Sequence, residues 1–214
     1  MNVKSLALGV IVVMALAGGA LAQDFQRPLY LTLADRPVPL DAFRVPRDRL
    51  ATQDSHPFLF IGRVMDEARP RWSDFRRAIR TYPDVDPCLE EEQRGTAAPD
   101  LLAFDWNGIR YTAAIEVCLF RVFQSLREPE LIEAWVLRQG FRTPGFDDYP
   151  SRRSDMRRIL SASWTPEQYG AEVMADLLLR PIWDLLSIAH SYSVTVYIGD
   201  NAQVTHVGFG PISK

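Results

Sequence analysis

The chain has 214 residues, of which 47% are hydrophobic and 24% are charged, and its formal net charge at pH 7 is −3. This composition is typical of a folded globular protein with one domain or two small ones. The near-neutral charge argues against nucleic acid as the main partner, because phosphate binding needs a strongly basic face.

The first 22 residues have the pattern of a secretory signal peptide. Lys4 gives a basic start, an apolar run follows at 6–16, and Ala20-Leu21-Ala22 supplies a cleavage site of small residues. The apolar run is shorter than the roughly 20 residues that a membrane-spanning helix needs. We therefore predict export to the periplasm or the medium, with cleavage near Ala22 and no transmembrane segment in the mature chain. A leader that is kept as an anchor is the alternative.

Cys88 and Cys118 are the only two cysteines of the chain. Export would place them in an oxidising compartment, where a single pair forms one intramolecular disulfide. The functional alternatives are a nucleophilic thiolate and a metal ligand. The chain has no CxxC spacing, however, and Cys118 lies in an apolar run that disfavours a reactive thiolate. We predict a structural disulfide.

The segment after the leader, residues 23–57, is rich in proline and arginine and predicts an extended N-terminal arm. Residues 58–64 are apolar and β-prone, and they predict a buried strand that opens the domain of residues 58–214.

Residues 73–82 predict an amphipathic helix with Ser73 as its cap. Its apolar positions have helical spacing: Phe75, Ala78, Ile79 and Tyr82. The opposite face is basic and consists of Arg76, Arg77 and Arg80. This basic face is a candidate for binding, although charge pairing with the acidic residues that follow is the simpler interpretation.

A β-hairpin is predicted over residues 101–121. Asn107-Gly108 is the pair typical of a two-residue type I′ turn, and apolar side chains alternate in the segment after it. A helix over 114–126 is the alternative, because four large apolar residues also have helical spacing there: Ile115, Leu119, Val122 and Leu126. We favour the strand.

The rest of the chain predicts helices and one closing hairpin. The helices are expected at 129–139, 151–160, 165–178 and 182–189, and the hairpin pairs 193–198 with 203–209. The turn-rich residues 143–150 predict a loop, with a candidate division into two subdomains near residue 145. The expected fold is therefore α+β, with antiparallel hairpins at 101–121 and 193–209 packed against four or five helices and one disulfide.

The sequence contains no motif for metal binding, nucleophilic catalysis or phosphate binding. The three histidines lack metal-ligand spacing: His56, His190 and His206. There is no serine-nucleophile elbow and no glycine-rich phosphate loop. We therefore predict no cofactor and no metal.

The strongest catalytic candidates are carboxyl groups, because glycan hydrolysis uses a pair of them. Glu116 has apolar neighbours, so burial there would raise its pKa, and its partner would be an aspartate. The candidate partners are Asp105, Asp147 and Asp148. A solvent-facing strand position is the structural alternative for Glu116. Among the tryptophans, Trp72 and Trp183 have no assigned packing role and are candidates for binding.

These observations lead to two main hypotheses. In the first, an exported periplasmic or secreted protein binds a protein or another envelope component without catalysis, as an accessory, inhibitor or immunity-like factor. In the second, it is a cell-wall or glycan hydrolase that uses Glu116 with an aspartate partner. A carrier of a small molecule or metal is a third hypothesis, for which the sequence shows no ligand set.

Overall fold

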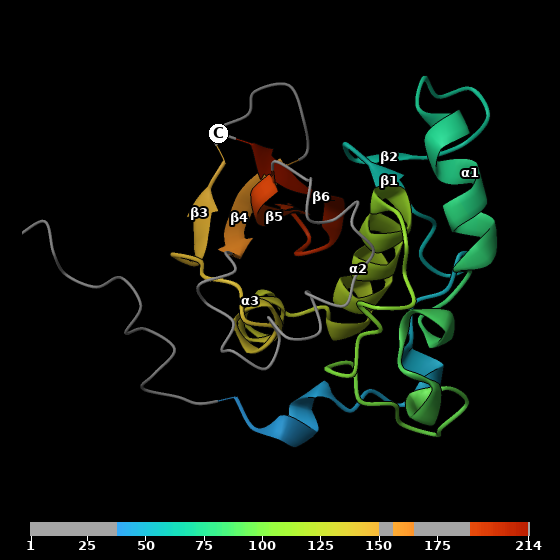
Figure 1. Cartoon of the computed structure of the whole chain (residues 1–214), viewed down its shortest axis with the longest axis vertical. Coiled ribbons are helices and arrows are strands. Elements are labelled where there is room, and N and C mark those ends of the chain that lie inside the picture. Colours follow the sequence, from blue (N-terminus) through green and yellow to red (C-terminus); the bar gives the residue numbers. More distant parts are fainter. Residues whose placement is uncertain (1–37, 150–155, 165–188, 214) are drawn as a thin grey trace, which may run out of the picture.

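The computed structural model describes residues 38–149, 156–164 and 189–213, and Figure 1 shows the course of the chain. Within these residues the helices are α1 (Trp72–Thr81), α2 (Thr112–Leu126) and α3 (Pro129–Arg138). The strands are β1 (Leu59–Phe60), β2 (Arg63–Val64), β3 (Phe146–Asp148), β4 (Met156–Trp164), β5 (Ala189–Gly199) and β6 (Val204–Ser213). The α+β class is confirmed. The expectation of four or five helices is wrong, since the described residues form three.

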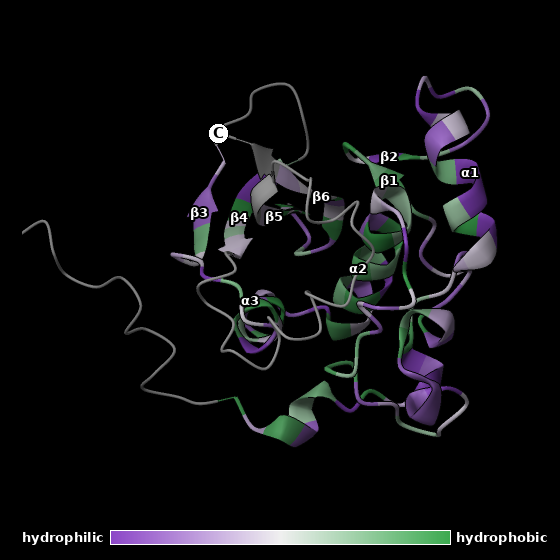
Figure 2. Cartoon of the chain, in the orientation of Figure 1, coloured by the Kyte–Doolittle hydropathy of each residue, from purple (hydrophilic) through white to green (hydrophobic). Residues whose placement is uncertain are grey.

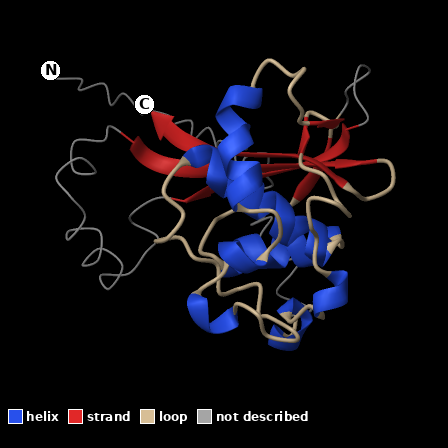
Figure 3. Cartoon of the chain, turned by 90° about the vertical axis from the view of Figure 1, so that its right-hand side faces the viewer, coloured by secondary structure: helices blue, strands red, loops and turns tan. Residues whose placement is uncertain are grey.

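The strands form two antiparallel sheets. One is the β1–β2 hairpin, and the other has the order β3-β4-β5-β6. In the larger sheet, Leu160 pairs with Val196 and Val196 pairs with Val207, so these buried side chains share one face. Figure 3 shows the helical part of the molecule largely on one side of this sheet.

The predicted hairpin at 101–121 is wrong, because residues 112–126 form helix α2. Ala114 and Cys118, which occupy the non-apolar positions of the supposed alternation, are as buried as their large neighbours. A helix that is buried on all sides has no polar face, so its sequence fits a strand period as well as a helical one. Figure 2 shows α2 as mostly hydrophobic and α1 as strongly hydrophilic on one side. Asn107-Gly108 does lie in a turn, but this turn leads into α2.

The predicted helix at 151–160 is also wrong over its described residues, which belong to strand β4. Leu160, Ala162 and Trp164 alternate on the buried face of the sheet. The prediction ended at residue 160, so it included only the first residue of this alternation. The predicted loop at 143–150 contains the short edge strand β3, which pairs with β4. The helix predicted at 165–178 lies outside the described residues. So does the helix predicted at 182–189, except for its last residue, Ala189, which begins strand β5.

Three other elements are confirmed. Helix α1 lies one residue closer to the N-terminus than the predicted range 73–82. It begins at Trp72, so Ser73 does not cap it. Helix α3 begins with Pro129 and ends before Gly140, whose φ of 84° is the left-handed conformation expected there. The closing hairpin is present as β5 and β6.

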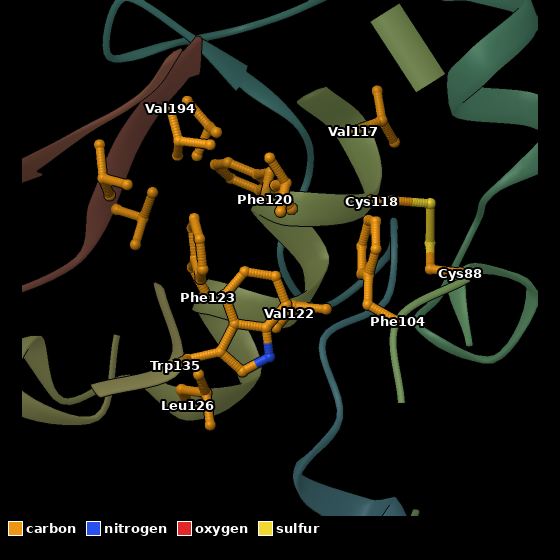
Figure 4. Close-up of a cluster of buried hydrophobic side chains, with 14 of the residues drawn as sticks. Cys88, Phe104, Val117, Cys118, Phe120, Val122, Phe123, Leu126, Trp135 and Val194 are labelled. Carbon is orange, nitrogen blue, oxygen red and sulfur yellow. A yellow bond between two sulfur atoms is a disulfide. The ribbon is translucent and has the colours of Figure 1, made fainter. Parts of the chain in front are cut away.

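The predicted disulfide between Cys88 and Cys118 is present. Both sulfur-bearing residues are fully buried, and the bond joins the loop before α2 to the middle of that helix. Figure 4 shows the bond beside Phe104, with Phe123 of α2 close to Trp135 of α3. The Trp135 ring lies 5.2 Å from the Phe123 ring, and its indole N–H donates to the Leu101 carbonyl. The core therefore joins the loops, all three described helices and the larger sheet.

Residues 38–57 of the predicted arm run along this core. They include two short 3₁₀-helices, Leu40–Phe43 and Arg47–Arg49, and they bury Phe43. Among the helices in the described ranges, none has both the length and the apolar character needed to cross a membrane.

Candidate functional site

The four candidate carboxyl groups lie in three separate parts of the structure. Glu116 is on α2 and contacts β6, which is one edge of the sheet. Asp147 and Asp148 are exposed on β3, which is the opposite edge. Asp105 precedes α2 and forms an ion pair with Arg94 at 3.1 Å. The structure therefore does not place Asp147 or Asp148 beside Glu116, and Asp105 already has a cationic partner.

Glu116 is buried with a hydrogen-bond partner for one of its two carboxyl oxygens, while Oε2 has none among the described residues. Its Oε1 accepts a hydrogen bond from the Phe209 N–H on β6 at 3.2 Å, and the residue is 6% exposed. Burial raises the pKa of Glu116, and the Phe209 N–H opposes that rise. The side chain thus satisfies a backbone donor on the edge strand and holds α2 against β6.

His206 lies on β6 among aromatic rings. Its ring is 4.7 Å from Phe60 in an edge-to-face contact and is stacked 5.5 Å from Tyr197. Its Nδ1 is buried and has no hydrogen-bond partner within the described residues. Burial, together with the nearby Arg71 charge, lowers the pKa of His206 to about 4. The folded protein therefore holds this imidazole neutral.

The lowered pKa of His206 predicts a loss of stability in acid. Between its ordinary value of 6.5 and about 4, the unfolded chain binds a proton that the folded chain does not, so stability falls as the pH falls. Relative to His206→Gln, the wild type should lose about 2 kcal/mol between about pH 8 and pH 5. Urea unfolding of both proteins at each pH measures this loss. Both proteins contain Glu116, so its contribution to the pH dependence of stability drops out of the difference between them. A difference that is independent of pH would contradict the prediction.

The remaining candidates are in several places. Trp72 is half-buried at the start of α1, and Trp183 lies outside the described residues. The basic residues of α1 are exposed, as the sequence predicted: Arg76, Arg77 and Arg80. His190 is on β5, and its side chain is outside the described part. His56 lies in the loop between Ala51 and Phe58.

The β1–β2 hairpin has a feature that the sequence did not indicate. Its two-residue turn, Ile61-Gly62, has positive φ at both positions, 52° and 70°, as a type I′ turn requires. Ile61 is β-branched and 52% exposed, and a positive φ is rare and strained for such a residue. The Gly62 N–H donates to the Thr205 carbonyl of β6 at 2.9 Å. The turn is therefore an apolar tip on a fixed base, and we call Ile61-Gly62 the hairpin tip.

An open cavity of about 350 Å³, which we call the polar cavity because most of its lining residues have polar side chains, lies where three segments meet. These are the loop around His56, the end of α2 and the turn between β5 and β6. The cavity is lined by His56, Gln124, Arg127, Asn201, Ala202 and Gln203. Only His56 was a candidate from the sequence. The others could not be found by motif, because only the folded chain brings these three segments together.

Comparisons with protein-family models, with curated proteins and with solved structures find no match to this chain. Within the described ranges, no group of three or more His, Cys, Asp or Glu residues is placed to hold a metal ion. The features of the described structure that bear on function are the hairpin tip, the basic residues near it and the polar cavity.

Proposed function

We propose that this chain is an exported protein that binds another protein of the bacterial envelope or an enzyme in that compartment, without catalysing a reaction itself. The observation that carries the proposal is the hairpin tip, where an exposed isoleucine occupies a backbone conformation that suits asparagine or glycine.

The choice of isoleucine at this position has no local benefit. Left-handed backbone costs a non-glycine residue about 1 to 3 kcal/mol, and the exposed side chain gains little from burial. The base of the hairpin is rigid, since Phe60 lies 5.6 Å from Phe75 of α1 and the Met65 N–H donates to the Phe58 carbonyl. Strain of this kind persists where the surrounding structure holds it in place, and it often marks a functional contact.

The charges around the tip indicate the chemistry of the partner. Arg63 is exposed on β2. Arg71 stacks on Phe60 and Phe75 at 4.9 and 4.8 Å from their ring centroids. Its charge is paired with Asp74 at 3.1 Å, however, so Arg63 is an unpaired positive charge beside the tip among the described residues. The exposed arginines of α1 extend this basic character along the helix. The matching surface is a protein recess with an apolar floor and an acidic rim, because opposite potentials steer and orient association.

Two further observations support the proposal. The Cys88–Cys118 disulfide fits a protein that reaches an oxidising compartment. Glu116 lies inside the α2–β6 contact, which favours binding over the glycan-hydrolase alternative, since that reaction needs a second carboxyl group in the same cleft.

The substitution Ile61→Asn tests the proposal. It gives the turn an Asn-Gly pair, so the free energy of unfolding should rise by about 1 kcal/mol. Removal of the apolar anchor should weaken partner binding by about tenfold or more. The chain starting at Gln23 is immobilised, partners are captured from envelope extract and identified by mass spectrometry, and the affinity of the purified partner is then measured for each variant.

Leu40→Asn is the matched control, because Leu40 is the most exposed large apolar residue in the described part of the chain, at 61%, and does not belong to the hairpin. We expect this variant to bind the partner as the wild type does. Binding that is unchanged in Ile61→Asn, or lost equally in both variants, would remove the hairpin tip as the contact and with it the main support for the proposal.

A further inference from the structure

The cavity at the end of α2 has a polar lining without an acidic residue. Its six lining residues contribute one guanidinium, one imidazole and three side-chain amides. Its volume of about 350 Å³ is at the lower end of the range for small-molecule sites. None of its lining residues belongs to the hairpin tip.

A buried positive charge lies behind the cavity. Arg121 of α2 is fully buried, and its guanidinium donates to the carbonyl oxygens of Tyr82, Thr52 and His56 and to the side chain of Gln53. All four acceptors are neutral, and within the described ranges Arg121 forms no ion pair. The charge of Arg121 is therefore hydrogen-bonded and offset only in part by Asp84, which acts on it without forming an ion pair, and it adds to the positive potential of the cavity wall.

Arg127 supplies the second positive charge and has an unusual backbone. Its φ of 65° and ψ of −43°, with the Glu128 N–H donating to the Leu126 carbonyl at 2.8 Å, form a classical γ-turn, which is rare and strained. Its side chain forms no ion pair with the described residues. The fold thus holds a strained arginine at the cavity with its guanidinium available.

The neighbouring groups of opposite sign are engaged or lie outside the lining. Asp200, next to the β5–β6 turn residues of the cavity, is paired with Arg157 at 2.6 Å. Asp54 and Glu128 are exposed and do not line the cavity. The carbonyls of Phe123 and Leu126, at the negative end of the helix, accept the N–H groups of Arg127 and Glu128. The lining itself therefore carries the positive charge of Arg127 and no negative charge. The charges of Arg127 and Arg121 both act on His56, whose pKa is lowered by burial and, to a smaller extent, by these two charges.

The amide side chains add directional hydrogen bonds. Gln124 uses its Nε2 to hold the Val204 carbonyl at 2.8 Å, which leaves its Oε1 as an acceptor. Gln203 accepts from the Asn201 amide at 3.2 Å, which leaves its own Nε2 as a donor. An arginine fork with one amide donor and one amide acceptor suits an oxyanion that carries a neighbouring hydroxyl group.

We propose that this cavity binds the carboxylate or phosphate group of a small polar ligand, with Arg127 as the main anion contact. The two ligand chemistries share a planar or tetrahedral oxyanion that an arginine fork can hold through two hydrogen bonds. Gln203 donates to the same group, and Gln124 accepts from a hydroxyl beside it.

A two-dimensional NMR titration of the full mature chain tests this inference. The probes are sodium phosphate and sodium glucuronate, each against sodium chloride at constant ionic strength. We expect saturable shifts of the Arg127, Ala202 and Gln203 amides with at least one probe. The probe that binds about tenfold more tightly identifies the ligand as phosphate or carboxylate.

Matched variants locate the charge that is responsible. Arg127→Gln should weaken binding by about tenfold, and Arg127→Lys should give an intermediate loss because it keeps the charge without the fork. Arg127→Gly removes the guanidinium and places at this position a residue that adopts positive φ freely. A loss of binding in this variant therefore cannot be attributed to misfolding. Arg110→Gln removes an exposed charge before the other end of α2 and should bind as the wild type does. Binding that is equal in Arg127→Gln and the wild type, or no probe binding beyond chloride, would overturn the proposal.

Discussion

Replacement of Cys88 and Cys118 by alanine together should lower the free energy of unfolding by about 3 to 4 kcal/mol. The bond closes a loop with a sequence separation of 30 residues, and its loss restores the freedom of that loop in the unfolded chain. In the native state it also fixes the long loop between α1 and α2, which supplies Leu89, Leu101 and Phe104 to the core. Urea unfolding followed by tryptophan fluorescence measures the change.

Reduction of the wild type separates the covalent link from side-chain packing. Wild-type protein kept in reductant should lose about the same free energy as the double alanine variant, because both lack the link. If the reduced wild type unfolds at the same urea concentration as the oxidised protein, the bond does not stabilise this fold and the prediction is wrong. A loss in the alanine variant alone would mean that the cavity left by the sulfur atoms is responsible.

The elements that could be predicted from the sequence are those with signals at their ends. Pro129 and Gly140 bound α3, and the β5–β6 hairpin has a polar turn between two β-branched segments. Helix α2 has no such contrast, because its apolar residues face the sheet, α1 and the disulfide loop at once. The sequence pattern of a segment that is buried on all sides therefore could not distinguish a helix from a strand. The helix is seen only in the folded structure.

The candidate sites could be predicted only in part. The disulfide followed from cysteine count, and the exposed arginines of α1 followed from helical periodicity. Ile61 and Arg127, two of the three non-glycine residues with positive φ in the described part of the chain, could not be found in this way, since neither belongs to a turn motif and only their backbone angles single them out. At the hairpin tip and at the polar cavity, residues adopt backbone conformations that are unfavourable for their type. Such exceptions are expected at sites that bind a partner or ligand.

Arg121→Met should lower the free energy of unfolding by about 2 to 4 kcal/mol, because it leaves the Tyr82 and His56 carbonyls without a donor. Burial lowers the pKa of Arg121 only to about 10, so the guanidinium remains charged at neutral pH. Its hydrogen bonds hold the loop from Thr52 to His56 against α2. Met is close to Arg in length and apolar, so the variant tests the donors rather than the volume.

Hydrogen exchange distinguishes loss of this contact from general destabilisation. In Arg121→Met, the His56 N–H, which donates to the Thr52 carbonyl at 2.8 Å, should lose protection more than amides in the centre of β5 do. Arg127→Met is the control, since it removes an exposed arginine from the same end of α2 and should change stability by less than about 1 kcal/mol. Because His56 lines the polar cavity, Arg121→Met should also weaken anion binding although Arg127 is intact. Wild-type protection of His56 in this variant would show that other contacts hold the loop, and would remove Arg121 as the residue that shapes the cavity.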